Sequence, residues 1–453
     1  MKHLNKLIVI IRELRNFIIF WIGQSLSEIG NRLTGFGLGI WVYQNTHEVA
    51  GLSLVIFFTT LPGVLITPFV GALVDRWNRK WTIIFSDLAA ATVTLALAVL
   101  LFTDHLEIWH TYITAFCTSV CGSFQMIAKG AALPMMVKKH QMGRANGLIY
   151  FSTAVGQLTA PILAGILIAS IQLEGLLIVD FSTYLIGLFT LLIIEIPQPE
   201  PRTTSTQGIR INTMLNDIAY GWNAIADNAI LLILLAFMTI HFFVDGMTTV
   251  LINPLILSFS SAKTFGSVMS IAGSGMLIGS ILMSIWGGGK KYISTLFTFA
   301  ALNGIALIIT GIKPYIPIIS IGLFLSFFTL PIILSTNMTI WQTSVNSNVQ
   351  GRVISLYSTF IGLALAFGNL SASPLTDKFL EPMLLDDGLL STSIGALIGT
   401  GQGRGIGFLM VMEGLLILMI SISLYTYFAL RNINSESNTQ QLIVTRKEIV
   451  EDL

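Results

Sequence analysis

The chain has 453 residues, of which 54% are hydrophobic and only 10% are charged, and its formal net charge at pH 7 is +1. This composition excludes a water-soluble globular protein and indicates an integral membrane protein. Basic and acidic residues nearly balance, and no basic arm with interleaved aromatic residues is present, which argues against nucleic-acid binding.

The first 16 residues carry basic side chains around a short apolar core, and no small-residue cleavage site follows them. We therefore expect residues 1–16 to be a retained cytoplasmic lead-in. Six apolar stretches follow, each long enough to cross about 30 Å of hydrocarbon as a helix. They span residues 17–43, 50–74, 81–103, 109–128, 146–170 and 175–196.

A polar segment, residues 197–229, interrupts the apolar pattern. It begins as a linker rich in proline, threonine and serine, and its second part, Met214–Asn228, repeats apolar residues at the spacing of an interfacial helix. Six more apolar stretches follow, at 230–257, 266–286, 292–312, 315–340, 352–376 and 406–430, before a polar cytoplasmic tail, 431–453. The sequence thus predicts an all-α membrane protein with twelve transmembrane helices in two six-helix bundles, 17–196 and 230–430.

The distribution of lysine and arginine predicts the orientation. With both termini in the cytoplasm, most of these residues fall in the inner segments. The outer loops then hold only Lys263, Lys313, Lys378 and Arg404. We expect a multi-pass protein of the plasma membrane, or of the inner membrane if the source is Gram-negative, that is a monomer.

The segment Gly71–Lys80 ends an uncharged apolar run in a cluster of charges. Gly71 allows a second helix to approach closely, and Asp75 supplies a negative charge. The basic residues of the cluster are Arg76, Arg79 and Lys80. The simpler interpretation is a loop that is basic only because it lies on the cytoplasmic side.

The two halves of the chain repeat some of these features. Gly143 and Arg144 open the fifth predicted helix as Gly351 and Arg352 open the eleventh, and Gly71 and Gly279 lie at matching positions with the same offset. Two parallel six-helix repeats would produce this pattern.

Asp75 and the amino end of the eleventh helix are expected on the same side of the membrane. Backbone N–H groups and the positive end of the helix dipole at Gly351 and Arg352 would favour the Asp75 carboxylate. We therefore predict a gating latch made by Gly71, Asp75, Arg76, Arg79, Lys80, Gly351 and Arg352. Arg79 is expected to pair with Asp217 or Asp227 of the linker helix.

Small residues recur at a defined spacing in the fifth stretch. They are Gly147, Gly156, Ala160, Pro161, Ala164 and Gly165. This spacing resembles the antiporter motif of exporters of the major facilitator superfamily, with alanine in place of two glycines, and Gly71–Lys80 resembles the loop between helices two and three of that superfamily. Close packing with a bend at Pro161 is the structural expectation, and ordinary small-residue packing is the alternative.

Three further stretches resemble the drug-efflux branch that contains the macrolide exporters and the enterobactin exporter. They are Ile340–Val353, Pro374–Met383 and the glycine-alternating run Gly399–Gly407. The resemblance implies twelve helices and export of chemically varied compounds. The chain departs from proton-coupled relatives in lacking an arginine in helix four, which offers Gln125 and Lys129, and in carrying Gly30-Asn31 where relatives have an acid.

Ionisable residues within apolar stretches indicate function because they are costly at membrane depth. Glu28 and Arg32 lie one turn apart and can pair, either as a protonation switch or as a static ion pair. Asp245 lies one turn beyond His241, which we interpret as a hydrogen-bonded helix residue. Glu28, Arg32 and Asp245 are the predicted ion-coupling residues. Asp87 and Asp180 are interpreted as interfacial or capping residues.

Aromatic residues of three stretches are predicted to line an apolar substrate cavity, although a lipid-facing position is the better interpretation for any single phenylalanine. They are Phe36, Trp41, Phe237, Phe242, Phe324 and Phe328. No phosphate-binding glycine motif occurs in Gly399–Gly407, and Cys117 and Cys121 are poorly placed for a disulfide, so no cofactor or metal is expected.

The resemblance implies a secondary efflux transporter with alternating access, which exchanges a small amphipathic drug or secondary metabolite for protons across the lipid bilayer. Export of a siderophore, peptide or lipid and uncoupled facilitation are alternatives. A membrane sensor or assembly partner that does not transport is an alternative of another class. The sequence shows no pair of catalytic groups or metal ligands at a spacing that would indicate an enzyme.

Overall fold

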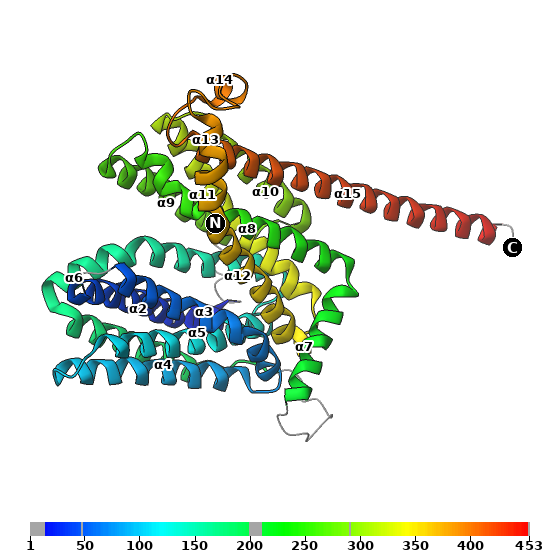
Figure 1. Ribbon diagram of the computed structural model, residues 1–453. Coiled ribbons are helices and arrows are strands. Elements are labelled where there is room, and N and C mark those ends of the chain that lie inside the picture. Colours follow the sequence, from blue (N-terminus) through cyan, green and yellow to red (C-terminus); the bar gives the residue numbers. More distant parts are fainter. Residues whose placement is uncertain (1–13, 47–48, 199–210, 290, 452–453) are drawn as a thin grey trace, which may run out of the picture. The chain divides into compact units, whose positions relative to one another are not determined.

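The computed structural model describes residues 14–46, 49–198, 211–289 and 291–451, and the regular structure within these ranges is helical (Figure 1). The predicted lead-in, residues 1–16, falls almost wholly outside them. In the first half, the helices are α2 (Arg15–Thr46), α3 (Val49–Val74), α4 (Arg79–Phe102), α5 (Ile108–Met136) and α6 (Met142–Ile193). They match the predicted apolar stretches.

Helix α6 contains both the fifth and the sixth predicted stretches. Gln172 has a φ of 59° and a ψ of −170°, which breaks the helix there into two spans. A second change of direction, a bend of 43°, separates Lys139–Ala160 from Ile162–Ile168. The chain therefore turns back at Gln172, between the two predicted stretches.

The linker helix and the second-half helices also agree with the prediction. They are α7 (Ile211–Ala226), α8 (Ala229–Leu257), α9 (Ala262–Trp286), α10 (Tyr292–Ile312), α11 (Ile316–Ser344), α12 (Gln350–Leu375) and α15 (Arg404–Glu451). Five short helical segments complete the set: η1 (Lys139–Gln141), η2 (Ser347–Val349), η3 (Thr376–Leu380), α13 (Glu381–Leu384) and α14 (Ile394–Ile398). The last helix does not end near residue 430 as expected, because the polar residues beyond it include no glycine or proline that would stop a helix.

Nine helices in the described ranges are long and apolar enough to cross a membrane, or ten if the bent first part of α6 is counted as one span. Helices α2 and α5, with 32 and 29 residues, are also long enough to cross. They are less apolar because they carry Glu28, Arg32 and Lys129. Together these helices make up a twelve-helix membrane fold.

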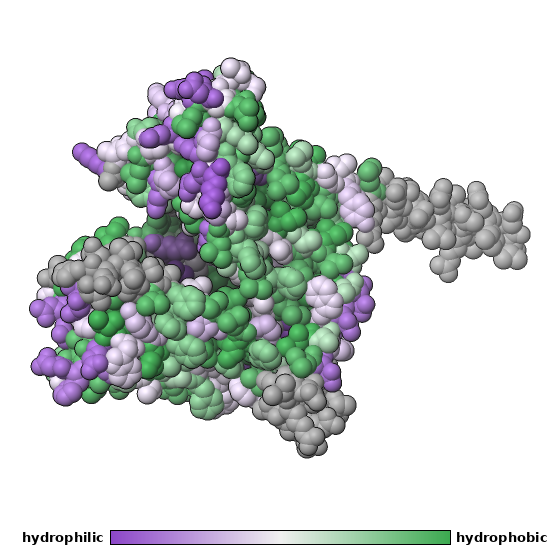
Figure 2. All heavy atoms as spheres, in the orientation of Figure 1, coloured by the Kyte–Doolittle hydropathy of each residue, from purple (hydrophilic) through white to green (hydrophobic). Residues whose placement is uncertain are grey.

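Many large apolar side chains are exposed on the helices, and hydrophobic residues cover much of the face shown in Figure 2. Phe85 is 63% exposed, Phe189 65% and Ile285 68%. Such exposure would be unfavourable in water and suits contact with lipid chains.

The described helices fall into two compact units. Unit 1 comprises Met1–Met247, Ser280–Gly287 and Met338–Leu370, and unit 2 comprises Thr248–Gly279, Gly288–Asn337 and Ser371–Leu453. In unit 1, α2 packs on α6, α3 on α5, and α4 on both α5 and α6. In unit 2, α10 packs on α15, and Gly304 and Gly414 let the two backbones come together.

Candidate transport site

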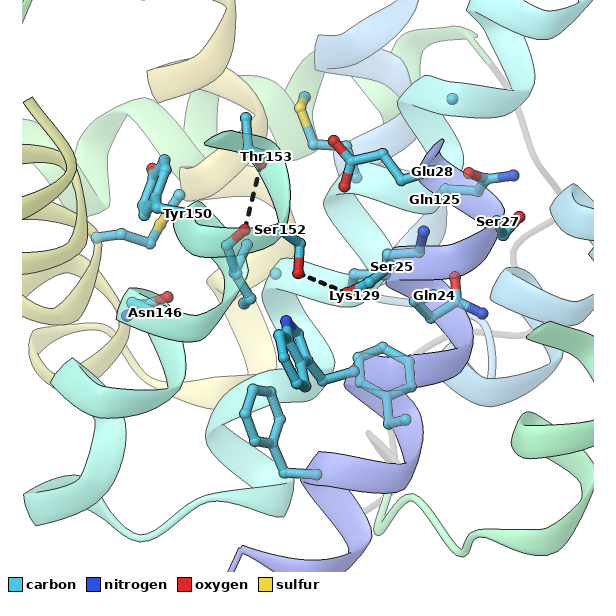
Figure 3. Close-up of a pocket in the computed structure, with 18 of the residues that line it drawn as sticks. Gln24, Ser25, Ser27, Glu28, Gln125, Lys129, Asn146, Tyr150, Ser152 and Thr153 are labelled. Carbon is cyan, nitrogen blue, oxygen red and sulfur yellow. Dashed lines mark hydrogen bonds between the residues drawn. The ribbon is translucent and has the colours of Figure 1, made fainter. Parts of the chain in front are cut away.

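A cavity of about 440 Å³ lies in unit 1, bounded mainly by α2, α5 and α6 (Figure 3). Met338 and Gln342, from the part of α11 that belongs to this unit, also line it. Its polar side chains are Gln24, Ser25, Ser27, Glu28, Asn31, Gln125, Lys129, Asn146, Ser152, Thr153 and Gln342. Its wall therefore carries one acid, one base and many amide and hydroxyl groups beside its apolar residues.

Hydrogen bonds between helices hold this wall in place. Ser25 and Ser152 join α2 to α6 through an oxygen–oxygen contact of 2.6 Å. The Asn146 amide donates to Gln342 Oε1 at 2.8 Å and to Thr339 Oγ1 at 3.0 Å, joining α6 to α11. Polar groups on different helices thus position one another around the cavity.

Glu28 and Arg32 form the predicted ion pair, with 2.7 Å between Glu28 Oε1 and Arg32 Nη2. Their side chains are 36% and 34% exposed, and Glu28 is the member that lines the cavity. Gly156 lies against the Arg32 side chain, where an added Cβ would be 3.0 Å from Cδ. Because Gly156 has no side chain, it leaves the space that the Arg32 side chain occupies.

The other small residues of α6 have different surroundings. Gly147 lies against the backbone of Met283 and Ser284, at the end of α9. Ala160 and Ala164 are buried in a cluster with Leu33 and Leu176. An added Cβ at Gly165 would meet nothing within 4 Å, and the side chain of Pro161 lies outside the described part of the chain. Close packing is thus found at four of the six positions, Gly147, Gly156, Ala160 and Ala164.

The predicted contact between Asp75 and the start of α12 is present within unit 1. Asp75 accepts hydrogen bonds from the backbone N–H groups of Gly351, at 2.8 Å, and Arg352, at 3.0 Å. Gly71 packs so closely on Ser355 and on the Gly351 carbonyl that a Cβ there would collide with both. The carboxylate thus caps the amino end of a helix, where the helix dipole favours negative charge.

The basic residues of this loop are arranged differently from the prediction. Arg76, and not Arg79, forms an ion pair with Asp217 of α7. Arg79 is the first residue of α4 and points inward, where it donates to the carbonyls of Ala131, at 2.8 Å, and Ser347. Its side chain is fully buried, and Nη2 lies 3.8 Å from Asp75 Oδ1. Lys80 donates to the Ile194 carbonyl at 2.7 Å.

Burial raises the pKa of Asp75 from 3.8 to about 6, although the hydrogen bonds from Arg352 and Gly351 and the charges of Arg79 and Arg352 act in the opposite direction. Arg352 Nη2 also lies 2.9 Å from Asp217 Oδ1. Asp75, Arg352, Asp217 and Arg76 therefore form one connected network.

Within the described part of the chain, the repeat-related contact between α6 and α9 is built without a carboxylate. Gly143 lies against the carbonyl of Gly287, and Arg144 Nε donates to the carbonyl of Ile285 at 3.0 Å. Backbone carbonyls therefore occupy the region that corresponds to Asp75 in the first half.

None of the six predicted aromatic residues is among those that line the described cavity. In α8, Phe237 is 1% exposed and packs edge-on against His241, which is 3% exposed. Phe324 and Phe328 stack on each other in unit 2. The rings at the cavity belong instead to Phe17, Phe20, Trp21, Tyr150 and Tyr184. Asp245 is not among the lining residues either, so a coupling role for it stays a prediction.

Asp87 and Asp180 are buried, with exposed fractions of 1% and 0%, and neither caps a helix end. Both lie well inside their helices, and Gln24 at the cavity donates to Asp87 Oδ2 at 3.0 Å. The signal in the sequence was the spacing of Asp87, Ala90, Ala91 and Thr94, which places small and polar residues on one face of α4.

Residues 20–369 match the family model described as Major Facilitator Superfamily. The chain belongs to this superfamily. Among curated superfamily members, macrolide efflux protein A of Streptococcus pyogenes is 25% identical over 372 residues, which cover 80% of this chain and 89% of that protein. Macrolide efflux protein A of Enterococcus faecalis is 27% identical over 330 residues, covering 71% and 98%.

Solved superfamily structures show the same fold at low identity. An outward-facing bacterial homologue of the iron transporter ferroportin aligns with a TM-score of 0.66 and 15% identity, covering 91% of this chain and all of that one. The Escherichia coli fucose:proton symporter aligns with a TM-score of 0.64 and 11% identity, covering 91% and 98%. The chain is therefore a membrane transporter of the major facilitator superfamily.

Proposed function

We propose that this transporter exports small amphipathic compounds of the macrolide type in exchange for protons, by alternating access. The observation that supports this most strongly is the cavity, which combines aromatic rings with the carboxylate of Glu28 and a ring of hydroxyl and amide groups. A macrolide such as erythromycin has matching chemistry: an apolar ring, several hydroxyl groups and a basic amine.

Substrate and proton would compete for the carboxylate of Glu28. A cationic amine entering the cavity would pair with the Glu28 carboxylate, and a proton on Glu28 would remove both that attraction and the ion pair with Arg32. Binding of one would therefore favour release of the other. Asp245, in α8, is the second residue proposed for ion coupling.

The network at Asp75 supports the proposed gating latch. It joins the end of α3 to the start of α12 through two backbone hydrogen bonds, and Arg76 and Arg352 extend it to α7. Opening this side of the transporter would require these contacts to separate. We place both termini and this network on the cytoplasmic side of the plasma membrane, as the distribution of basic residues favours.

The test is transport of radiolabelled erythromycin into inside-out proteoliposomes that contain the purified full-length chain, with an imposed pH gradient. We expect accumulation that collapses when the gradient is dissipated, and loss of both accumulation and erythromycin-induced proton flux in Glu28→Gln. Proton flux that is unchanged in both Glu28→Gln and Asp245→Asn would reject the proposed coupling residues.

A panel of other compounds separates the alternatives. Transport of a catecholate siderophore, a peptide or a fluorescent lipid, but not of erythromycin, would replace the proposed substrate class. Equilibration without accumulation would identify an uncoupled facilitator, and absence of any transport with binding retained would identify a sensor.

A further inference from the structure

The polar groups around the cavity of unit 1 fall into two classes, according to whether another group of the protein already binds them. Many are held by a partner within the wall. Ser25 pairs with Ser152, Asn146 donates to Gln342, and Trp21 Nε1 donates to a backbone carbonyl of α6 at 2.9 Å. The hydrogen bonds of this first class hold the helices together.

Lys129 of α5 belongs to the second class. It lines the cavity (Figure 3) and is half-buried. Within the described ranges its ammonium forms neither a hydrogen bond nor an ion pair. Nζ is not one of the buried atoms that lack a partner, so it is accessible from the cavity. Its three N–H donors are therefore available to a ligand.

Gln125 adds a neutral donor beside this cation. It lies one turn before Lys129 on the same face of α5, and it also lines the cavity. Its side-chain amide has no hydrogen-bond partner among the described residues. An ammonium and an amide on neighbouring turns of one helix can bind the same ligand group.

Two acids bear on the charge of this region, and neither forms an ion pair with Lys129 in the described structure. Glu28 of α2 lines the same cavity but is held by Arg32. Asp87 of α4 acts on Lys129 only electrostatically, is 1% exposed and is not a lining residue; its Oδ2 accepts a hydrogen bond from Gln24. A cation at membrane depth without a direct counter-ion is costly. The acid group of a ligand can supply the missing contact.

The rest of the cavity fits the other parts of such a ligand. Both hydrogen bonds from Arg32 go to Oε1 of Glu28, which leaves Oε2 for an amine. The rings of Phe17, Trp21 and Tyr150 are among the apolar faces of the wall. The cavity therefore offers one site for a positive group, one for a negative group, and apolar surface for the body of the ligand.

We propose that Lys129 and Gln125 bind the acid group of the substrate, so that the preferred substrates are zwitterionic amphipathic compounds with an amine at Glu28 and a carboxylate at Lys129. This inference rests on the proposed efflux function and narrows its substrate class. The carboxylate accepts a charge-assisted hydrogen bond from the ammonium and a second hydrogen bond from the amide. Erythromycin has no acid group and uses only the Glu28 side of the cavity.

Rhodamine 110 and its methyl ester, rhodamine 123, are a matched pair of probes. Both contain the same planar cationic dye, and only rhodamine 110 has a free carboxylate. Fluorescence polarisation with the purified full-length chain in lipid nanodiscs measures the affinity of each, with empty nanodiscs as the reference for partition into lipid. We expect the wild type to bind rhodamine 110 about tenfold or more tightly than rhodamine 123. Equal affinities would overturn the proposal.

Variants of Lys129 assign this preference to its charge. In Lys129→Gln the affinity for rhodamine 110 should fall by about tenfold or more, while the affinity for rhodamine 123 stays within about twofold and shows that the cavity is intact. Lys129→Arg keeps the charge and should keep the preference. Lys139→Gln is the matched control, because Lys139 is exposed and is not a lining residue. Equal loss for both probes in Lys129→Gln would overturn the assignment, because it would show that Lys129 only supports the wall.

Gln125→Ala tests the second donor. The affinity for rhodamine 110 should fall by about threefold, as expected for one hydrogen bond, and the affinity for rhodamine 123 should not change. An unchanged affinity for rhodamine 110 would exclude Gln125 from the acid site.

These binding measurements need neither transport nor a proton gradient, so they separate this inference from the proposed function. Erythromycin uptake driven by a pH gradient, together with equal binding of the two dyes, would uphold the exchange and overturn the acid site. A preference for rhodamine 110 that Lys129→Gln abolishes, in a chain that moves erythromycin without proton flux, would uphold the acid site and overturn the exchange.

Discussion

Gly156 of α6 and the side chain of Arg32 of α2 are in direct contact, and a Cβ at position 156 would lie 3.0 Å from Arg32 Cδ and 3.2 Å from its Nε. Arg32 in turn holds Glu28 at 2.7 Å. The small-residue motif of α6 and the charged pair of α2 are therefore parts of one arrangement.

Gly156→Leu should displace Arg32, separate it from Glu28 and reduce efflux by about tenfold or more, because the large side chain has no free space to occupy. Gly165→Leu is the matched control from the same motif, since nothing lies within 4 Å of a Cβ there. Initial rates of erythromycin efflux measure both. If Gly156→Leu exports erythromycin at the wild-type rate, transport does not depend on close packing of α6 at this position.

Asp75→Asn should reduce transport more than substrate binding. The amide replaces one acceptor oxygen by a donor that faces a backbone N–H group of α12, at a cost of about 1–3 kcal/mol to this contact. Equilibrium binding of labelled erythromycin and initial transport rates test this. Asp104→Asn is the matched control, because Asp104 is an exposed acid at a turn with a φ of 59°, which asparagine tolerates. Equal loss of binding and transport would contradict a latch.

The buried arrangement of Asp75 should become more favourable as pH falls, because protonation removes the cost of burying its charge. The pKa of Asp75 is about 6 in this buried arrangement and 3.8 when solvated, so the buried arrangement binds the proton more tightly. Lowering the pH from about 7 to about 5 therefore favours the buried arrangement over one in which Asp75 meets water. Hydrogen–deuterium exchange of the Gly351 and Arg352 amides, corrected for intrinsic rates, should show increased protection. Decreased protection would show that a lower pH disfavours the buried arrangement of Asp75.

Arg352 should matter more for stability than Arg76, although both pair with Asp217. Arg352 is 5% exposed and also lies near Asp75, whereas Arg76 is 30% exposed, and water screens its charge. Thermal unfolding should show a loss of about 3 kcal/mol for Arg352→Gln and below about 1 kcal/mol for Arg76→Gln. Equal effects would show that Asp75 adds nothing to the role of Arg352.

Most of the fold could be predicted because length and apolarity alone define a membrane-spanning helix. The span Tyr292–Ile312 agrees with its predicted bounds, and the turn at Gln172 falls between two predicted stretches. The contact of Asp75 with Gly351 and Arg352 also followed from the sequence, since a helix start and a carboxylate were expected on one side of the membrane.

The partners of buried polar residues could not be predicted from a single sequence. Arg76 and Arg79 are three residues apart, and only the direction of α4 decides that Arg76 meets Asp217 while Arg79 turns inward. Asp87 looked peripheral because its partner, Gln24, comes from a helix distant in sequence. The polar cavity wall was missed for the same reason, since single serines, glutamines and asparagines on three helices become a site only when the helices pack.

The two repeat-related contacts of unit 1 differ in chemistry. One joins α3 to α12 through the Asp75 carboxylate, and the other joins α6 to α9 through the carbonyls of Ile285 and Gly287. A carboxylate changes its charge with pH, whereas a backbone carbonyl does not. Acidity can therefore act on the first of these acceptors and leave the second unaltered, so a symmetric fold responds to protons asymmetrically.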